Sequence, residues 1–92
     1  TNNPASVGFA TLEALGVADR FPVLVGLDDV GAPKPDPEGF NRVLQKTGIA
    51  ATEVLSIGDR YDVDLKAVLD AGGGGLLVHL VRDIYNLPEV LP

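Results

Sequence analysis

The chain has 92 residues, enough for one small domain at most, and 13 acidic against 7 basic residues give it a net charge of −6. An acidic chain without a basic patch repels nucleic acid phosphates, which excludes nucleic-acid binding, and the absence of cysteine excludes disulfides and thiolate metal sites. It has neither an apolar run of about 18 residues nor a basic apolar leader, so we expect no membrane span, no signal peptide and a cytoplasmic location.

The expected elements alternate between helices and strands. In chain order they are a helix over 6–15, a strand over 22–26, a helix over 37–46, a strand over 54–57, a helix over 62–69 and a strand over 76–79. The glycine run 72–75 indicates a flexible turn or a helix stop, and the tail over 83–89 a loop or short helix that packs back through Tyr85 and Leu87. Strands separated by helices form crossover units, so the pattern predicts an α/β fold with a parallel sheet.

The segment that opens the chain, Thr1-Asn2-Asn3-Pro4, is typical of a turn between a strand and a helix. A threonine hydroxyl and the following backbone amides can hold a phosphate oxygen at such a turn. The alternative is a plain helix start with Asn3 or Ser6 as the cap.

A lysine flanked by prolines precedes the second helix. Pro33 and Pro35 fix the local backbone, so Lys34 is presented in one place, where it can reach an anion near the start of the helix. Asp36 is a good helix cap and Pro37 a good first helical residue. The alternative interpretation is a solvated lysine in a proline-rich turn.

Three carboxylates follow the strand expected over 54–57. A strand delivers the next residue to the carboxyl end of the sheet, where open α/β folds bind ligands; we expect Gly58 to permit a tight turn there. Mg²⁺ needs only one or two carboxylates beside a substrate phosphate, and Asp59 with Asp64 or Asp62 provides them. Alternatively, Asp62 caps the next helix and the other two are solvated turn charges.

Three further residues are interpreted mainly as structural. His79 is expected to be packed or on an edge strand, and Tyr61 to be a packing residue. Arg60 is left open between contacting a substrate and pairing with a neighbouring acid.

Taken in order, Thr1-Asn2, Lys34-Pro35-Asp36-Pro37 and Gly58-Asp59-x-x-x-x-Asp64 resemble motifs two to four of the haloacid dehalogenase-like hydrolase superfamily. The resemblance is to the phosphatase-like subfamily whose cap is inserted after motif one, and it implies a Rossmann-like sheet. It also implies that Thr1, with Asn2, binds the phosphoryl group and that Lys34 neutralises that group and steadies the nucleophile. Asp59 and Asp64 would hold Mg²⁺, and the substrate would be a small phosphorylated metabolite.

The family's motif one, an Asp-x-Asp nucleophile motif on the central strand, is missing. The adjacent pair Asp28-Asp29 is interpreted as surface loop. Residues 1–92 therefore resemble the C-terminal half of the core domain, incomplete because the central nucleophile strand is absent. An open sheet invites association, so we expect either a longer polypeptide or self-association to cover the gap.

Two functions follow from the resemblance. The first is part of a Mg²⁺-dependent hydrolase that acts on phosphate esters through an aspartyl-phosphate, inactive as an isolated chain for lack of the nucleophile. The second is a non-catalytic fragment or degenerate module that binds metal or a protein partner. A phosphoacceptor receiver domain fits less well, because its acidic residues precede its lysine, whereas Lys34 precedes Asp59.

Overall fold

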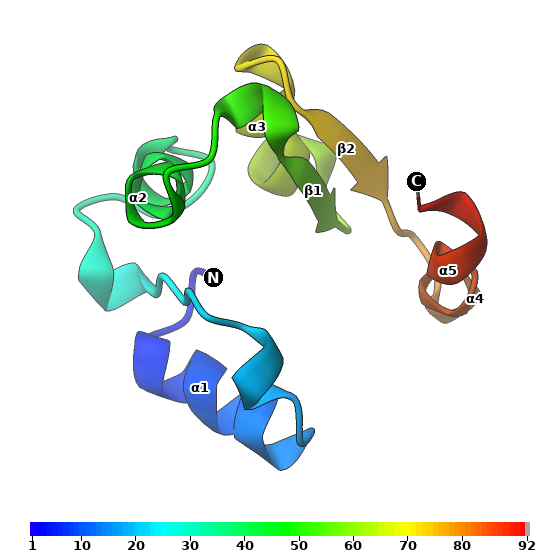
Figure 1. Ribbon diagram of the computed structural model, residues 1–92, viewed down its shortest axis with the longest axis horizontal. Helices are drawn as coiled ribbons and strands as arrows, with labels where there is room; N and C mark the ends of the chain where they lie inside the picture. Colours follow the sequence, from blue (N-terminus) through cyan, green and yellow to red (C-terminus); the bar gives the residue numbers. More distant parts are fainter. Residues whose placement is uncertain (92) are drawn as a thin grey trace.

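The computed structural model of the chain describes residues 1–91. The helices are α1 (Ala5–Ala14), α2 (Glu38–Thr47), α3 (Lys66–Asp70), α4 (Val81–Tyr85) and α5 (Leu87–Val90), and the strands are β1 (Leu55–Gly58) and β2 (Gly74–Leu77). Short 3₁₀ turns lie at Ala18–Arg20, Leu27–Asp29 and Ala51–Glu53, and a π-helical turn at Tyr61–Leu65 leads into α3. Figure 1 shows α1 at one end of the molecule, the strands with α3 at the other, and α2 between them. None of the helices within residues 1–91 has the length and apolar character needed to cross a bilayer.

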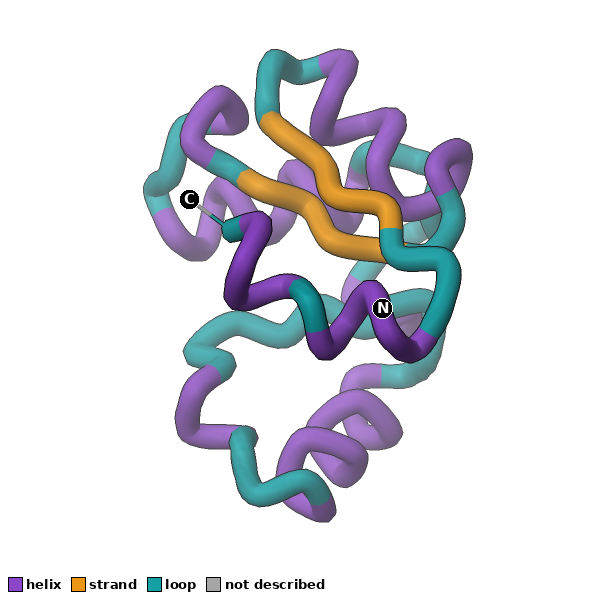
Figure 2. Tube along the Cα trace, turned by 90° about the vertical axis from the view of Figure 1, so that its right-hand side faces the viewer, coloured by secondary structure: helices purple, strands orange, loops and turns teal. Residues whose placement is uncertain are grey.

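The two strands are parallel and lie side by side in Figure 2. Leu55 pairs with Gly74 and Gly58 with Leu77, and α3 provides the crossover between the strands. This arrangement confirms the prediction of an α/β fold with a parallel sheet, here in incomplete form.

The glycine run is part of the packed structure rather than a flexible turn. Gly72 has φ +93° and ends α3 as a helix stop. A Cβ on Gly73 would lie 2.6 Å from Cγ1 of Val68, so this residue lets the chain pass close to α3. The last strand therefore begins at Gly74, two residues before the expected start, because pairing with β1 outweighs the low strand propensity of glycine.

The strand expected over 22–26 does not form, so that prediction is wrong. Residues 23–26 form neither a helix nor a strand and pair with only a short segment: the Thr1 backbone nitrogen donates to the Val25 carbonyl at 2.9 Å, and the Leu27 N–H donates to the Asn3 carbonyl at 2.8 Å. Two such hydrogen bonds do not form the regular pairing that defines a β-strand. Within residues 1–91 the sheet has only β1 and β2.

The acidic pair Asp28-Asp29 is exposed, as expected, and has a structural role. Oδ1 of Asp28 accepts a hydrogen bond from the Ala5 N–H at 2.8 Å, at the first residue of α1, and Oδ2 of Asp29 accepts one from the Gly26 N–H at 2.8 Å. The expected caps Asn3 and Ser6 are therefore wrong, because a carboxylate from another part of the chain satisfies the free amide.

Helix α2 agrees with its prediction within one residue. Asp36 accepts a hydrogen bond through Oδ1 from the Glu38 N–H at 3.0 Å, and Gly48 ends the helix with φ +70°. The helix thus begins just after the proline-rich segment and holds the position of the loop that carries Lys34.

The core is small. Among the described apolar side chains only Val25, Leu65 and Val68 are buried. Tyr85 is 78% exposed, so the expectation that it packs back on the body is wrong. Many large apolar side chains thus stay exposed to solvent, as expected of a structure that still has apolar surface to bury.

Candidate functional site

Residues from three distant segments line one cavity. The cavity has a volume of about 350 Å³, and its lining includes Thr1, Asn2, Lys34 and Asp64. Its walls are otherwise mainly apolar and come from residues 23–26, α2 and β1. Asp59 and Asp62 do not belong to this lining, although they lie in the same turn after β1.

An ion pair joins the loop before α2 to the turn after β1. Nζ of Lys34 lies 2.6 Å from Oδ1 of Asp64, and the two side chains are 38% and 14% exposed. Burial raises the pKa of the Asp64 carboxyl, but four other effects outweigh it, so the pKa is below its ordinary value. These effects are the hydrogen bond from Lys34, the hydrogen bond from the Arg60 N–H, the positive charge of Lys34 and a hydrogen bond with the Asp59 side chain. Asp64 is therefore ionised under ordinary conditions.

Local hydrogen bonds turn the Asp64 side chain back over the end of β1. Its Oδ2 accepts from the Arg60 N–H at 3.1 Å, and its carbonyl accepts from the Ser56 hydroxyl at 2.8 Å. A Cβ on Gly58 would lie 2.4 Å from the Cβ of Asp64 and 2.7 Å from its Oδ2.

This contact corrects the expected reason for Gly58. The residue is the last of β1 and its φ is not positive, so it does not supply a left-handed turn. It provides room for Asp64 instead.

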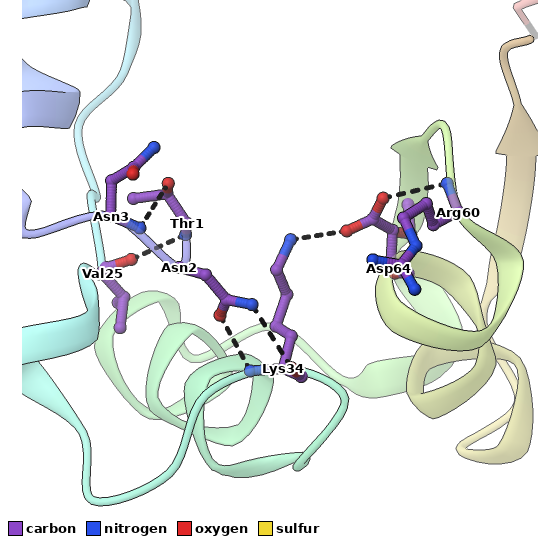
Figure 3. A network of polar contacts seen from close by, with 8 residues as sticks. Thr1, Asn2, Asn3, Val25, Lys34, Arg60 and Asp64 are labelled. Atoms are coloured by element: carbon purple, nitrogen blue, oxygen red, sulfur yellow. Dashed lines mark hydrogen bonds and ion pairs between the residues drawn. The ribbon is translucent and has the colours of Figure 1, made fainter.

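A second polar contact fixes the lysine from its other side (Figure 3). Oδ1 of Asn2 accepts a hydrogen bond from the Lys34 N–H at 2.8 Å, and Nδ2 of Asn2 donates to the Lys34 carbonyl at 3.3 Å. The Thr1 hydroxyl accepts from the Asn3 N–H at 3.1 Å. The sequence pattern did not indicate the contact between Asn2 and Lys34, because these residues are 32 positions apart.

The two carboxylates Asp59 and Asp64 are suitable ligands for a hard cation that keeps most of its water. Asp59 and Asp64 are close enough for a side-chain hydrogen bond, and both follow a strand at the carboxyl end of the sheet. Within residues 1–91 there is no cluster of three or more histidine, cysteine or carboxylate side chains. Mg²⁺ needs only one or two protein carboxylates, so this pair is sufficient in kind and number.

The remaining polar residues near the turn have ordinary structural surroundings. Arg60 lies 4.0 Å from Asp62, with side chains 65% and 72% exposed, a weak surface ion pair of the kind expected if Arg60 pairs with a neighbouring acid. Tyr61 is 53% exposed and His79 is exposed beyond the end of β2, so the expected packing of both residues is wrong.

The fold defines an α/β domain with a parallel sheet. A crystal structure of a HAD phosphatase from Thermococcus onnurineus aligns with a TM-score of 0.78 at 24% identity, covering 91% of this chain and 45% of that one. This likeness concerns the fold. The sequence identifies the family, because residues 1–72 match the model of haloacid dehalogenase-like hydrolases. The chain belongs to this family, and the resemblance seen in its motifs is confirmed.

Curated relatives point to the phosphatase-like branch. The phosphoglycolate phosphatase of Yersinia pseudotuberculosis is 40% identical over 72 residues, a stretch that covers 78% of this chain and 31% of the relative. The phosphoglycolate phosphatase of Escherichia coli K12 is 39% identical over 72 residues, with 78% and 28% covered. The chain thus spans less than a third of the length of these relatives.

Proposed function

We propose that residues 1–92 form the C-terminal half of the core domain of a phosphatase and supply the phosphate-binding and metal-binding side of its active site. The observation that carries the proposal is the meeting of Thr1, Asn2, Lys34 and Asp64 around one cavity in a chain of this family. The substrate class is a small phosphate monoester, and the names of the phosphoglycolate phosphatase relatives support this class.

The chemistry required of these residues is mainly electrostatic. Phosphoryl transfer depends on positioning and on neutralising the charge that spreads over the phosphoryl oxygens. The Lys34 ammonium provides a positive charge at the cavity, held by Asp64 at 2.6 Å, and the Thr1 hydroxyl provides a neutral polar contact. Asp59 and Asp64 would hold Mg²⁺, which supplies further positive charge when bound.

The nucleophile must come from polypeptide outside these residues. Asp28 and Asp29 accept hydrogen bonds from the Ala5 and Gly26 N–H groups and do not line the cavity. We assign the nucleophile to an additional strand that enters between β1 and residues 1–3, as part of a longer polypeptide. Its carboxylate would form the aspartyl-phosphate.

The hydrogen-bonding direction of β1 supports this position for the strand. The Val54 and Gly58 carbonyls accept from Gly74 and Val78, on the β2 side. Since successive residues of a strand direct their backbone groups to opposite sides, those of Leu55 and Ile57 face away from β2, toward the cavity. Backbone donors and acceptors on such an edge require partners, which a parallel strand would provide.

The proposal is tested by Mg²⁺-dependent hydrolysis of a phosphomonoester. We expect turnover from the longer polypeptide and none from residues 1–92 alone. In the active polypeptide, Lys34→Ala removes a positive charge at the transferring group and should lower kcat by about 100-fold or more. Lys46→Ala, which removes an exposed lysine from the last turn of α2, is the matched control and should leave kcat unchanged.

The alternative is a non-catalytic module. It predicts Mg²⁺ binding to residues 1–92 in calorimetry and no turnover from any longer polypeptide. An intact mass of the native protein above 9.6 kDa with activity that is insensitive to Lys34→Ala would also contradict the proposed role of this lysine.

A further inference from the structure

The Asn2 side chain uses both of its polar groups on a single residue. Oδ1 accepts from the Lys34 N–H at 2.8 Å and Nδ2 donates to the Lys34 carbonyl at 3.3 Å. Figure 3 shows the Asn2 amide directed at the backbone of Lys34, while the Lys34 side chain extends away toward Asp64. The amide is thus paired with the lysine backbone in the way that a neighbouring strand would be.

The residues around Lys34 make this pairing specific. Pro33 and Pro35 have no backbone N–H, so Lys34 provides the one backbone donor among residues 33–35. A carboxamide carries an uncharged acceptor and a donor on one planar group, and the asparagine side chain reaches both backbone groups of Lys34 here. Alanine would leave both backbone groups of Lys34 without this partner, and aspartate would place a carboxylate oxygen against the Lys34 carbonyl.

We propose that Asn2 is a positioning residue that fixes Lys34 for the phosphoryl group, and that its side chain does not contact the phosphate. This inference rests on the function proposed for Lys34. The phosphate contact expected of Asn2 would then be made by its backbone amide, beside the Thr1 hydroxyl and the Lys34 ammonium.

Lys34 therefore connects the two walls of the cavity. Asn2 belongs to the segment that lies beside Val25, whereas Asp64 belongs to the turn after β1. Lys34 contacts Asn2 through its backbone and Asp64 through Nζ, so the lysine is held from both walls. Loss of the Asn2 amide leaves the Lys34 backbone without its partner on that wall, so the flexible four-carbon side chain is then positioned mainly by Asp64.

A double-mutant cycle in the active longer polypeptide tests the inference. Asn2→Ala should lower kcat about 10-fold or more with a smaller change in KM, because it misplaces Lys34 without removing a phosphate contact. In a Lys34→Ala background the same change should have almost no further effect, because the group that it positions is already gone. Asn3→Ala, one position along, is the matched control and should keep wild-type kcat.

Two outcomes would overturn the inference. Effects of Asn2→Ala and Lys34→Ala that multiply in the double variant would show that Asn2 acts on the substrate independently. A higher inhibition constant for inorganic phosphate with unchanged kcat would show direct phosphate binding by the asparagine side chain.

A measurement without turnover separates this inference from the proposed function. Hydrogen exchange of the Lys34 amide should accelerate at least 10-fold in Asn2→Ala and stay unchanged in Asn3→Ala, whether or not the protein is a phosphatase. If Asn2→Ala does not fold, Asn2→Asp is the second variant: it places a carboxylate oxygen against the Lys34 carbonyl, and this repulsion should also accelerate exchange of the Lys34 amide. Unchanged exchange in both Asn2 variants would refute the contact itself.

Discussion

Replacing Gly58 by alanine should damage the site through Asp64. The added Cβ would lie 2.4 Å from the Asp64 Cβ and 2.8 Å from its Cγ, and neither atom is the free end of a flexible side chain. The turn after β1 must therefore shift, and Asp64 then loses the hydrogen bonds from Lys34 and the Arg60 N–H. The change combines overpacking with the loss of charged hydrogen bonds.

The magnitude follows from these two effects. Overpacking of a well-filled position costs about 1 to 3 kcal/mol. The Lys34 side chain is 38% exposed, so loss of its ion pair adds no more than about 1 kcal/mol. We expect the free energy of unfolding to fall by about 1 to 4 kcal/mol in Gly58→Ala.

Gly39→Ala provides the control for this prediction. Gly39 lies in α2, and a Cβ there meets nothing within 4 Å among residues 1–91, so alanine should stabilise the helix by about 0.5 to 1 kcal/mol. Urea unfolding of the longer polypeptide measures both variants at one pH. A Gly58→Ala protein as stable as the wild type, with the same activity, would refute the reasoning about Asp64.

Three further predictions concern charge, capping and assembly. The pKa of Asp64 is lowered in the folded state, so its contribution to stability is present above its ordinary pKa and is lost as the pH falls through the lowered value. Urea midpoints should therefore fall less between pH 5 and about pH 2 in Asp64→Asn than in the wild type, and an equal fall would contradict the pairing. Asp28→Ala should cost about 1 kcal/mol by uncapping α1, measured by urea unfolding against Asp19→Ala, which alters an exposed acid elsewhere. Residues 1–92 alone should associate in sedimentation velocity as concentration rises, and cooperative unfolding of a dilute monomer would argue against an open sheet edge.

Local patterns in the sequence predicted the elements whose partners are close by. Helix α2 and strand β1 were placed within one residue, because apolar spacing, a proline before the helix and Gly48 after it are local signals. The strand over 22–26 had an equally clear apolar pattern and did not form, since a strand also needs a neighbour along its length. Val25 of this segment is nevertheless buried.

Residue type and order select candidate site residues but not their contacts. Of the residues selected, Thr1, Asn2, Lys34 and Asp64 line one cavity and Asp59 does not, and their roles stay predictions. The hydrogen bonds between Asn2 and Lys34 join residues 32 positions apart, and the bond between Asp28 and the start of α1 joins residues 23 positions apart. A local sequence pattern cannot predict contacts over such separations. The reason for Gly58 was also hidden, because it depends on a side chain six positions later that folds back on the strand.

The two walls of the cavity depend on each other through very few contacts. One wall carries residues 1–3 and Val25, the other carries β1 and Asp64, and Lys34 spans them. An added strand would bury the apolar lining of both walls and pair with the free edge of β1, so it would order Lys34 and Asp64 without touching either. Phosphate affinity should therefore rise when the additional polypeptide is present even if its carboxylate is replaced by asparagine. Equal affinity of residues 1–92 and of that longer variant for inorganic phosphate in calorimetry would mean that the walls are already fixed without the strand.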